Sequence, residues 1–246
     1  MHASAKMTPM TAQFLTMGGG GFSMSPLGAP TELDRYLLEL ADVRTPLVCF
    51  APTASADDPR YINKFLTAYG TLGVRTMVLT LWEDAGHSVE RLEEADVVLV
   101  GGGHTVNLMA LWDAHGVTVR LARMAAQKDV VFGGLSAGGA CWFEGCITDS
   151  FGGFRPWRGG MHMLEGSFCP HFDGEADRAP VYTEAVASGD LPGGYAVDDG
   201  AAIHFVGNQV HAYVAERPGA GVRAVHPSNH PGTSGVVVEP MRVEVL

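Results

Sequence analysis

Positive charge is scarce in this sequence and is never concentrated. The 246 residues include 16 Lys and Arg against 27 Asp and Glu, a formal net charge of −11. Proteins that bind nucleic acids need a positive face to displace counterions from the phosphates, so we expect no nucleic-acid partner. The acidic balance indicates little else about function, because net charge mainly affects solubility and association.

Long apolar runs are missing as well. No stretch approaches the roughly 18 apolar residues that a membrane-spanning helix needs. The beginning of the sequence, MHASAKMTPMTAQ, lacks the apolar core of a secretory signal peptide. We therefore expect no membrane partner and a cytoplasmic location.

Cysteine is rare, and the spacing of the cysteines does not match a metal-binding motif. The four cysteines form no CxxC pair; they are Cys49, Cys141, Cys146 and Cys169. We expect them to be small buried side chains in a reducing compartment rather than disulfide partners. The densest His/Cys segment, HMLEGSFCPH over residues 162–171, matches no zinc spacing, so we expect no metal and no cofactor.

Apolar runs alternate with helical patterns through the first half of the chain. They predict strands over 13–19, 46–52, 75–82, 96–103 and 130–136, and helices over 32–41, 58–73, 87–95 and 105–129. Strands without polar alternation are typical of a sheet covered on both faces, and helical crossovers favour parallel pairing. The sequence predicts an α/β fold, with a doubly wound, mostly parallel sheet and helices on both faces, in one domain over residues 1–246.

The last third of the chain has a different pattern. Segments 194–216 and 235–246 alternate more strongly and predict C-terminal β-hairpin strands, with Gly207-Asn208 as one turn.

A lone serine lies in a glycine cluster at the end of the fifth predicted strand. Residues 134–138 read GLSAG and match the G-x-S-x-G nucleophile elbow, which exposes a serine hydroxyl at a sharp strand-to-helix turn. The following AGGACWF segment predicts the start of a helix. A plain tight turn is the competing interpretation of Ser136.

A second glycine corner follows the fourth predicted strand. In parallel sheets, ligands gather at the carboxyl ends of the strands, so Gly101–Gly103 should lie near Ser136. Backbone N–H groups of Ala137 and of the Gly102–Gly103 turn would then form an oxyanion hole. A phosphate cradle is disfavoured, because neither GGGHTV at 101–106 nor GGGGFS at 18–23 fits a phosphate-binding motif.

A serine nucleophile needs a base and an acid that orients the base. Among ten histidines, His171 follows Pro170, which stiffens the backbone, and His104 lies beside the second glycine corner, where it could line a pocket. Spacing does not choose among the acids, which are Asp149, Asp173, Glu175, Asp198 and Asp199.

Four ordered motifs, VVLVGGGHT, GGLSAGGACWF, GSFCPHFDGE and GYAVDDGAAI, resemble the aspartyl dipeptidase (peptidase E) family of serine peptidases, to which cyanophycinase is related. The resemblance spans about residues 12–215 and implies a fold similar to class I glutamine amidotransferases, in which cysteine replaces the elbow serine. It implies Ser136 as nucleophile, His171 as base and Asp199 as acid, with Asp198 as the alternative. It implies oxyanion donors at Gly102 and Ala137.

The chain departs from that family at three points. His104 stands where relatives commonly have asparagine, and Asp199 stands where they often have glutamate, so the acid must approach His171 more closely. The arginine that binds the substrate's aspartate has no unambiguous match; Arg178 is the nearest candidate, and Arg155 and Arg158 are others.

These observations predict a serine dipeptidase that hydrolyses small peptides, with His104 and Arg178 as substrate-binding residues. Two alternatives stay open: a catalytically inactive binding protein with an amidotransferase-like pocket, and a cyanophycinase-like depolymerase of β-linked aspartyl-arginine chains. A homodimer is also left open.

Overall fold

A parallel sheet lies at the centre of the computed structural model, which describes residues 12–228 and 235–246. Its strands, in spatial order, are β1 (Gln13–Met17), β5 (Val131–Leu135), β4 (Val97–Val100), β2 (Leu47–Ala51) and β3 (Arg75–Val78). All neighbours among these five strands are parallel. The predicted parallel sheet is confirmed.

An antiparallel extension continues this sheet beyond β1. Strand β10 (Ala201–Val206) pairs with β1, and β11 (Gln209–Ala215) pairs with β10 around the predicted Gly207-Asn208 turn. Strand β14 (Glu244–Val245) adds a short parallel pair at the edge. The hairpin expected at Gly207-Asn208 is confirmed.

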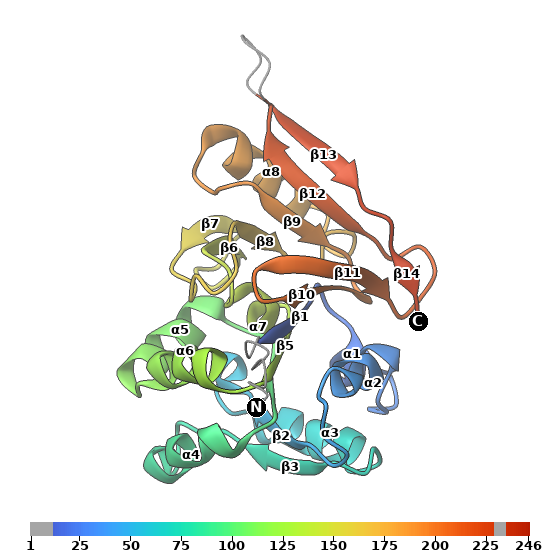
Figure 1. Ribbon diagram of the computed structural model, residues 1–246. Helices are drawn as coiled ribbons and strands as arrows, with labels where there is room; N and C mark the ends of the chain where they lie inside the picture. Colours follow the sequence, from blue (N-terminus) through green and yellow to red (C-terminus); the bar gives the residue numbers. More distant parts are fainter. Residues whose placement is uncertain (1–11, 229–234) are drawn as a thin grey trace, which may run out of the picture.

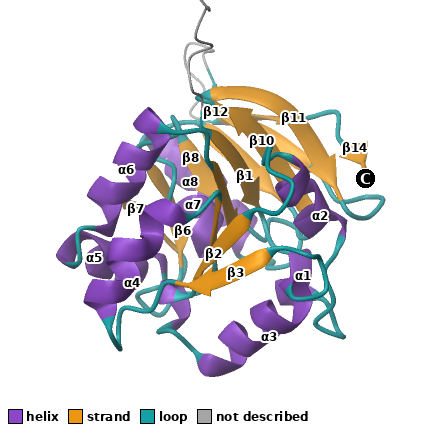
Figure 2. Ribbon diagram, turned by 60° about the horizontal axis from the view of Figure 1, so that its bottom comes forward, coloured by secondary structure: helices purple, strands orange, loops and turns teal. Residues whose placement is uncertain are grey.

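Helices cover both faces of the sheet (Figures 1 and 2). One side carries α1 (Gly21–Met24), α2 (Glu32–Glu39) and α3 (Pro59–Tyr69), and the other carries α4 (Ala85–Arg91), α5 (Thr105–Ala114) and α6 (Val117–Gln127). Short 3₁₀ turns lie at η1 (Thr53–Ser55) and η2 (Leu92–Glu94). Each side buries its own apolar cluster, one including Phe22 and Phe65, the other Trp112 and Leu121. The double winding is therefore confirmed.

A second sheet, which the sequence pattern did not predict, occupies the upper half of Figure 1. Its strands run in the order β13 (Val236–Pro240), β12 (Val222–Pro227), β9 (Gly194–Val197), β8 (Ser167–Cys169), β6 (Gly145–Thr148) and β7 (Arg155–Arg158). Helix α8 (Arg178–Ser188) packs against it through Tyr182 and Val186. Segment 194–197, expected in a hairpin with β10, instead belongs to this sheet and pairs with β8 in parallel.

The two sheets meet where β1 and β9 end. Gly19 and Asp199 form an isolated parallel bridge, and the Gly200 N–H donates to the Gly19 carbonyl oxygen at 2.9 Å. The segments that follow β1 and β9 are therefore joined at this point.

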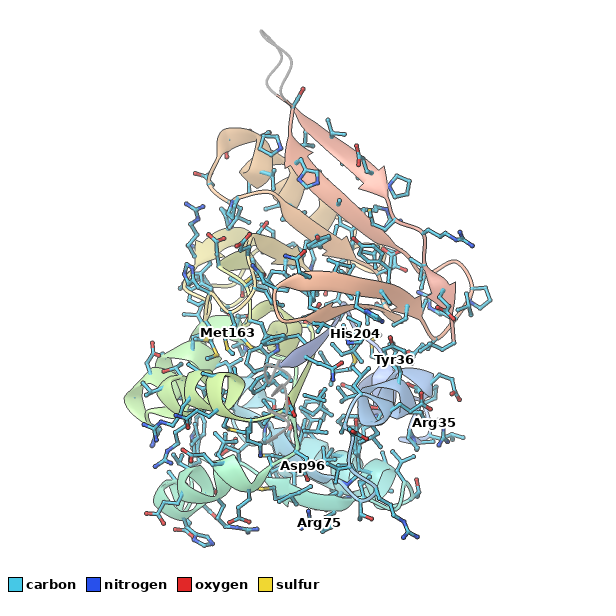
Figure 3. The ribbon with its side chains drawn as sticks, in the orientation of Figure 1. Arg35, Tyr36, Arg75, Asp96, Met163 and His204 are labelled. Carbon is cyan, nitrogen blue, oxygen red and sulfur yellow. The ribbon has the colours of Figure 1, made fainter. Side chains whose placement is uncertain are left out.

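Figure 3 shows a buried polar contact that links the extension to the helical layer. His204 on β10 is 3% exposed, and its Nδ1 lies 3.0 Å from the hydroxyl of Tyr36 on α2. Burial and the nearby His211 lower the pKa of His204 to about 4. The ring is therefore neutral near pH 7, and we assign it to the packing of the fold.

Asp34 is a buried carboxyl at the start of α2. It closes a capping box with Thr31, whose N–H donates to it at 2.8 Å, and it accepts the Tyr69 hydroxyl at 2.9 Å. The side chain is fully buried, and burial raises its pKa from 3.8 to about 6, although these hydrogen bonds partly oppose the shift. The folded protein therefore binds this proton more tightly than the unfolded chain does.

This shift predicts a stability change with a definite sign. Because the folded pKa lies above the unfolded one, the contribution of Asp34 is complete below about pH 4 and is lost as pH rises through about 6. We expect the free energy of unfolding to fall by on the order of 3 kcal/mol across that interval. Asp34→Asn should remove the fall in urea titrations, whereas the exposed Asp42→Asn control should keep it. Identical pH slopes in both variants would contradict the prediction.

Candidate active site

Ser136 lies at the sharp turn between β5 and α7 (Ala137–Ala140). Its φ of 54° and ψ of −112° are strained for a non-glycine residue, a feature that concentrates at functional sites. A Cβ at Gly134 would lie 1.9 Å from the Gly138 carbonyl oxygen, and one at Gly138 would lie 2.2 Å from the Val100 carbonyl oxygen. The glycine spacing of the motif therefore allows the close packing behind the serine.

The helix after Ser136 is shorter than the sequence predicts. Helix α7 ends at Ala140, and the buried Cys141–Phe143 segment leads into β6 of the second sheet. Ala137 is the first residue of α7, and the N–H groups of a helix's first turn have no acceptor inside that helix. The Ala137 N–H therefore has no acceptor within α7.

The second glycine corner lies against the serine, as expected. A Cβ at Gly102 would be 3.5 Å from the Ser136 Cβ and 3.4 Å from the Leu135 carbonyl oxygen. The Gly102 N–H donates to the Tyr61 hydroxyl over 3.4 Å, which is long for a hydrogen bond. The structure thus brings Gly102 beside Ser136 with its N–H only weakly bonded.

His171 and Asp199 meet although 28 residues separate them. They follow β8 and β9, which are parallel neighbours in the second sheet, and His171 Nδ1 lies 2.5 Å from Asp199 Oδ1. Each side chain is 20% exposed, and the hydrogen bond with His171 is the largest cause of a lowered pKa at Asp199. Because Nδ1 is hydrogen-bonded to Asp199, Nε2 is the ring nitrogen that can accept a proton from another group. The aspartate side chain is therefore long enough to reach His171.

Gly19 connects this pair to the serine, and the sequence analysis missed it. A Cβ there would lie 2.1 Å from Asp199 Oδ1 and 2.7 Å from His171 Cε1. Two residues earlier, the Met17 carbonyl oxygen accepts the Ser136 N–H at 3.0 Å. The serine and the His–Asp pair therefore border the same end of β1. The available signal was the glycine run that begins inside the predicted strand 13–19, and the sequence pattern was weighed there only as a phosphate-binding motif.

Two further residues hold the Asp199 backbone. The Asp199 N–H donates to Asp173 Oδ1 at 2.9 Å, and Asp173 Oδ2 accepts from Arg217 at 3.0 Å. Asp173 was a candidate acid, but its oxygens are occupied by these two donors. No local pattern in the sequence indicated Arg217.

Asp198, the alternative acid, points elsewhere. Its side chain is 2% exposed and accepts Arg223 Nη1 at 2.6 Å and the Gly221 N–H at 2.9 Å. It joins the end of β9 to the start of β12. The structure therefore brings Asp199, and not Asp198, to His171.

This difference predicts separate effects for the two neighbours. Asp198→Ala removes the buried carboxylate that holds Arg223 and the Gly221 N–H, so we expect the free energy of unfolding to fall by on the order of 2 kcal/mol. Urea unfolding measures this, and turnover per folded molecule should be retained. Normal stability combined with lost turnover would instead make Asp198 the functional carboxylate.

The predicted substrate-binding residues occupy different environments. His104 is exposed at the start of α5 and lines a cavity with Trp82. Arg178 is 4% exposed, with its Nε bonded to Glu175 and its Nη1 to the Ile147 carbonyl oxygen. Its guanidinium is thus held by groups of the protein itself. Arg155 and Arg158 lie exposed at the two ends of β7.

The four cysteines are free and buried, as predicted. Within residues 12–228 and 235–246, no helix is long and apolar enough to cross a membrane.

Comparisons with known proteins agree with this architecture. The chain matches Peptidase family S51 over residues 14–213. It is 42% identical over 219 residues to the uncharacterized peptidase YgaJ of Bacillus subtilis (strain 168), covering 89% of this chain and 94% of the relative.

Solved structures share the fold at lower sequence identity. A peptidase from an acI-B1 Actinobacterium superposes with a TM-score of 0.67 at 16% identity, covering 96% of each chain. A candidate peptidase E protein from Listeria monocytogenes EGD-e gives 0.60 at 19% identity, covering 82% of this chain and 97% of that one. The chain is a peptidase with an α/β, amidotransferase-like fold. It belongs to Peptidase family S51, which confirms the resemblance to the aspartyl dipeptidases.

Proposed function

We propose that this protein is a serine peptidase that hydrolyses short peptides, with Ser136 as nucleophile, His171 as general base and Asp199 as the residue that orients the base. The observation that carries the proposal is the 2.5 Å contact between His171 Nδ1 and Asp199 Oδ1. Gly19 packs against this pair just beyond Met17, which accepts the Ser136 N–H. A strained serine and a hydrogen-bonded histidine–carboxylate pair at the same end of β1 are the three groups that a catalytic triad requires.

The acylation step uses the histidine twice. His171 Nε2 accepts the hydroxyl proton while Ser136 Oγ attacks the scissile carbonyl carbon, and the carbonyl π electrons move onto oxygen. When the tetrahedral intermediate collapses, the C–N bond breaks and Nε2 gives its proton to the leaving amine. The acyl group stays on Ser136 Oγ as an ester.

Deacylation repeats the sequence with water. Nε2 takes a proton from water as the water oxygen attacks the ester carbon, and the C–Oγ bond then breaks. The proton returns to Ser136 Oγ, and the acid product leaves. Throughout, Asp199 keeps the proton on Nδ1 and stabilises the imidazolium.

Backbone N–H groups of Gly102 and Ala137 would receive the negative oxygen. One such donor typically contributes about 3 kcal/mol to lowering the barrier. The long Gly102–Tyr61 bond fits this role, because an oxyanion can replace a weakly bonded hydroxyl at little cost.

The peptidase E relationship supports short peptides as substrates, and four buried free thiols support the expected reducing, cytoplasmic setting. The single-domain organisation and the roles of His104 and Arg178 in substrate binding stay predictions, and a homodimer stays open.

A dipeptide panel with acidic, neutral and basic first residues tests the proposal. We expect the wild type to hydrolyse at least one class and to react with a fluorophosphonate probe at Ser136, located by mass spectrometry of the labelled peptide. Tight binding of dipeptides without turnover or labelling would favour the inactive binding protein. Release of aspartyl-arginine units from a β-linked polymer, with no dipeptide turnover, would favour the depolymerase.

A further inference from the structure

A cavity of about 590 Å³ opens beside the glycine corner. Its wall combines the turn after β2, Trp82 after β3, and the corner and first turns of α5, including Ala54, Gly103, His104, Ala110 and Leu111. Gly103 follows Gly102, which packs against Ser136. The cavity therefore begins one residue from the proposed oxyanion site.

Strand order places this cavity on a defined flank of the serine. Along the sheet, β5 carries Ser136 and lies between β1 and β4. The His171–Asp199 pair borders Gly19 after β1, whereas the cavity lies at the ends of β4, β2 and β3. The histidine and the cavity thus occupy opposite flanks of the nucleophile.

This arrangement separates the two halves of a substrate. The leaving amine must reach His171 to receive its proton, so the leaving half lies on the β1 flank. The cavity on the β4 flank is then available to the residue that donates the scissile carbonyl group.

The chemistry of the wall indicates what this residue is. Among the described residues that line the cavity there is no Lys, Arg, Asp or Glu, and its polar side chains are Thr53, Ser55, His104 and Asn107. A substrate carboxylate buried there would lack a lysine or arginine partner, and His104 is the one side chain of this wall that can carry positive charge. The indole of Trp82 and the alanine and leucine side chains favour an apolar occupant.

The cavity is also held open by the protein itself. Asp57 Oδ2 accepts the Leu81 N–H at 2.6 Å and the Trp82 N–H at 3.2 Å, which fastens the Trp82 segment to the turn after β2. The His104 N–H donates to the Ala54 carbonyl oxygen at 2.8 Å and fastens the third wall. A preformed pocket selects side chains without an ordering cost.

We propose that this cavity is the specificity pocket for the acyl-side residue of the substrate and accepts a neutral, apolar side chain such as leucine or phenylalanine, not aspartate. The inference rests on the proposed serine peptidase function, and it assigns Trp82 and Ala110 as specificity-determining residues.

The test compares kcat/KM for Leu-Ala, Phe-Ala, Asp-Ala and the reversed Ala-Leu and Ala-Phe. The wild type should favour Leu-Ala or Phe-Ala over Asp-Ala by about tenfold or more. Ala110→Arg places a cation in the cavity and should shift the Leu-Ala to Asp-Ala ratio toward Asp-Ala by about tenfold. Ala114→Arg, one turn along α5 and outside the cavity wall, is the matched control and should leave the ratio unchanged.

Trp82→Ala supplies an independent readout. Removing the indole should raise KM for Phe-Ala and leave Ala-Ala unaffected, because only a large side chain reaches that wall. A preference that follows the second residue, strong for Ala-Leu and absent for Leu-Ala, overturns the acyl-side assignment. A Leu-Ala to Asp-Ala ratio equal in wild type and Ala110→Arg overturns the pocket while leaving the peptidase function intact.

Calorimetric binding of the same dipeptides to Ser136→Ala tests the pocket separately from the proposed peptidase activity. If Leu-Ala binds more tightly than Asp-Ala and Ala110→Arg abolishes this preference, the pocket is supported. A wild type that cleaves no dipeptide would then overturn only the proposed function. Equal binding of Leu-Ala and Asp-Ala overturns the pocket.

Discussion

Ser136→Ala is expected to lower kcat/KM for dipeptides by about five to six orders of magnitude, because the hydroxyl forms the acyl bond. Alanine keeps the φ of 54° and loses only the oxygen of a partly exposed side chain, so the free energy of urea unfolding should stay within about 0.5 kcal/mol of wild type. Fluorophosphonate labelling should disappear. Ser188→Ala, at the end of α8, is the control and should retain both labelling and turnover.

A second substitution at the same position makes this result specific. Ser136→Cys should retain a nucleophile and become the site of reaction with a thiol reagent, since Cys49, Cys141, Cys146 and Cys169 are all buried. Turnover by Ser136→Ala within about tenfold of wild type would remove this residue from the mechanism.

Asp199→Asn is expected to lower kcat by about four orders of magnitude while the chain stays folded. The carboxylate accepts the proton of His171 Nδ1, which leaves Nε2 free to accept one. An amide at this position presents N–H groups toward Nδ1 and favours the opposite tautomer, in which Nε2 cannot act as a base. Steady-state kinetics at pH 7 with circular dichroism on the same sample provide the measurement.

The double variant His171→Ala/Asp199→Asn distinguishes an indirect role from a direct one. If Asp199 acts only through His171, the double variant should be no slower than His171→Ala alone. Additive losses, or a loss below tenfold in the single variant, would show that the carboxylate does not orient the base.

Local features of the chain predicted the central parallel sheet and the sharp turn that carries Ser136. Continuous apolar runs such as 96–103 and 130–136 mark buried parallel strands because both of their faces are covered. The elbow was visible because its glycines are required by contacts within the segment itself and with the neighbouring strand. Helix α7 was overestimated, since the chain leaves it after Ala140 to enter the second sheet.

The second sheet escaped the sequence pattern for a physical reason. Strands β6, β7 and β8 are three or four residues long, and their stability comes from pairing with distant segments rather than from local propensity. Segment 194–197 looked like part of a hairpin because the next strand follows closely, but its partners are β8 and β12.

The position of Ser136 thus follows from its own segment, where a buried strand, a tight turn and small residues at fixed spacing leave one hydroxyl partly exposed. The local segment does not decide whether Asp198 or Asp199 reaches His171, because adjacent residues in an extended chain point to opposite sides. Asp198 faces Arg223, and Asp199 faces His171, only once β9 has paired between β8 and β12. His171 and Asp199 follow strands of a different sheet from the one that carries Ser136, so bringing the three residues to one region depends on long-range strand pairing that no local stretch of residues encodes.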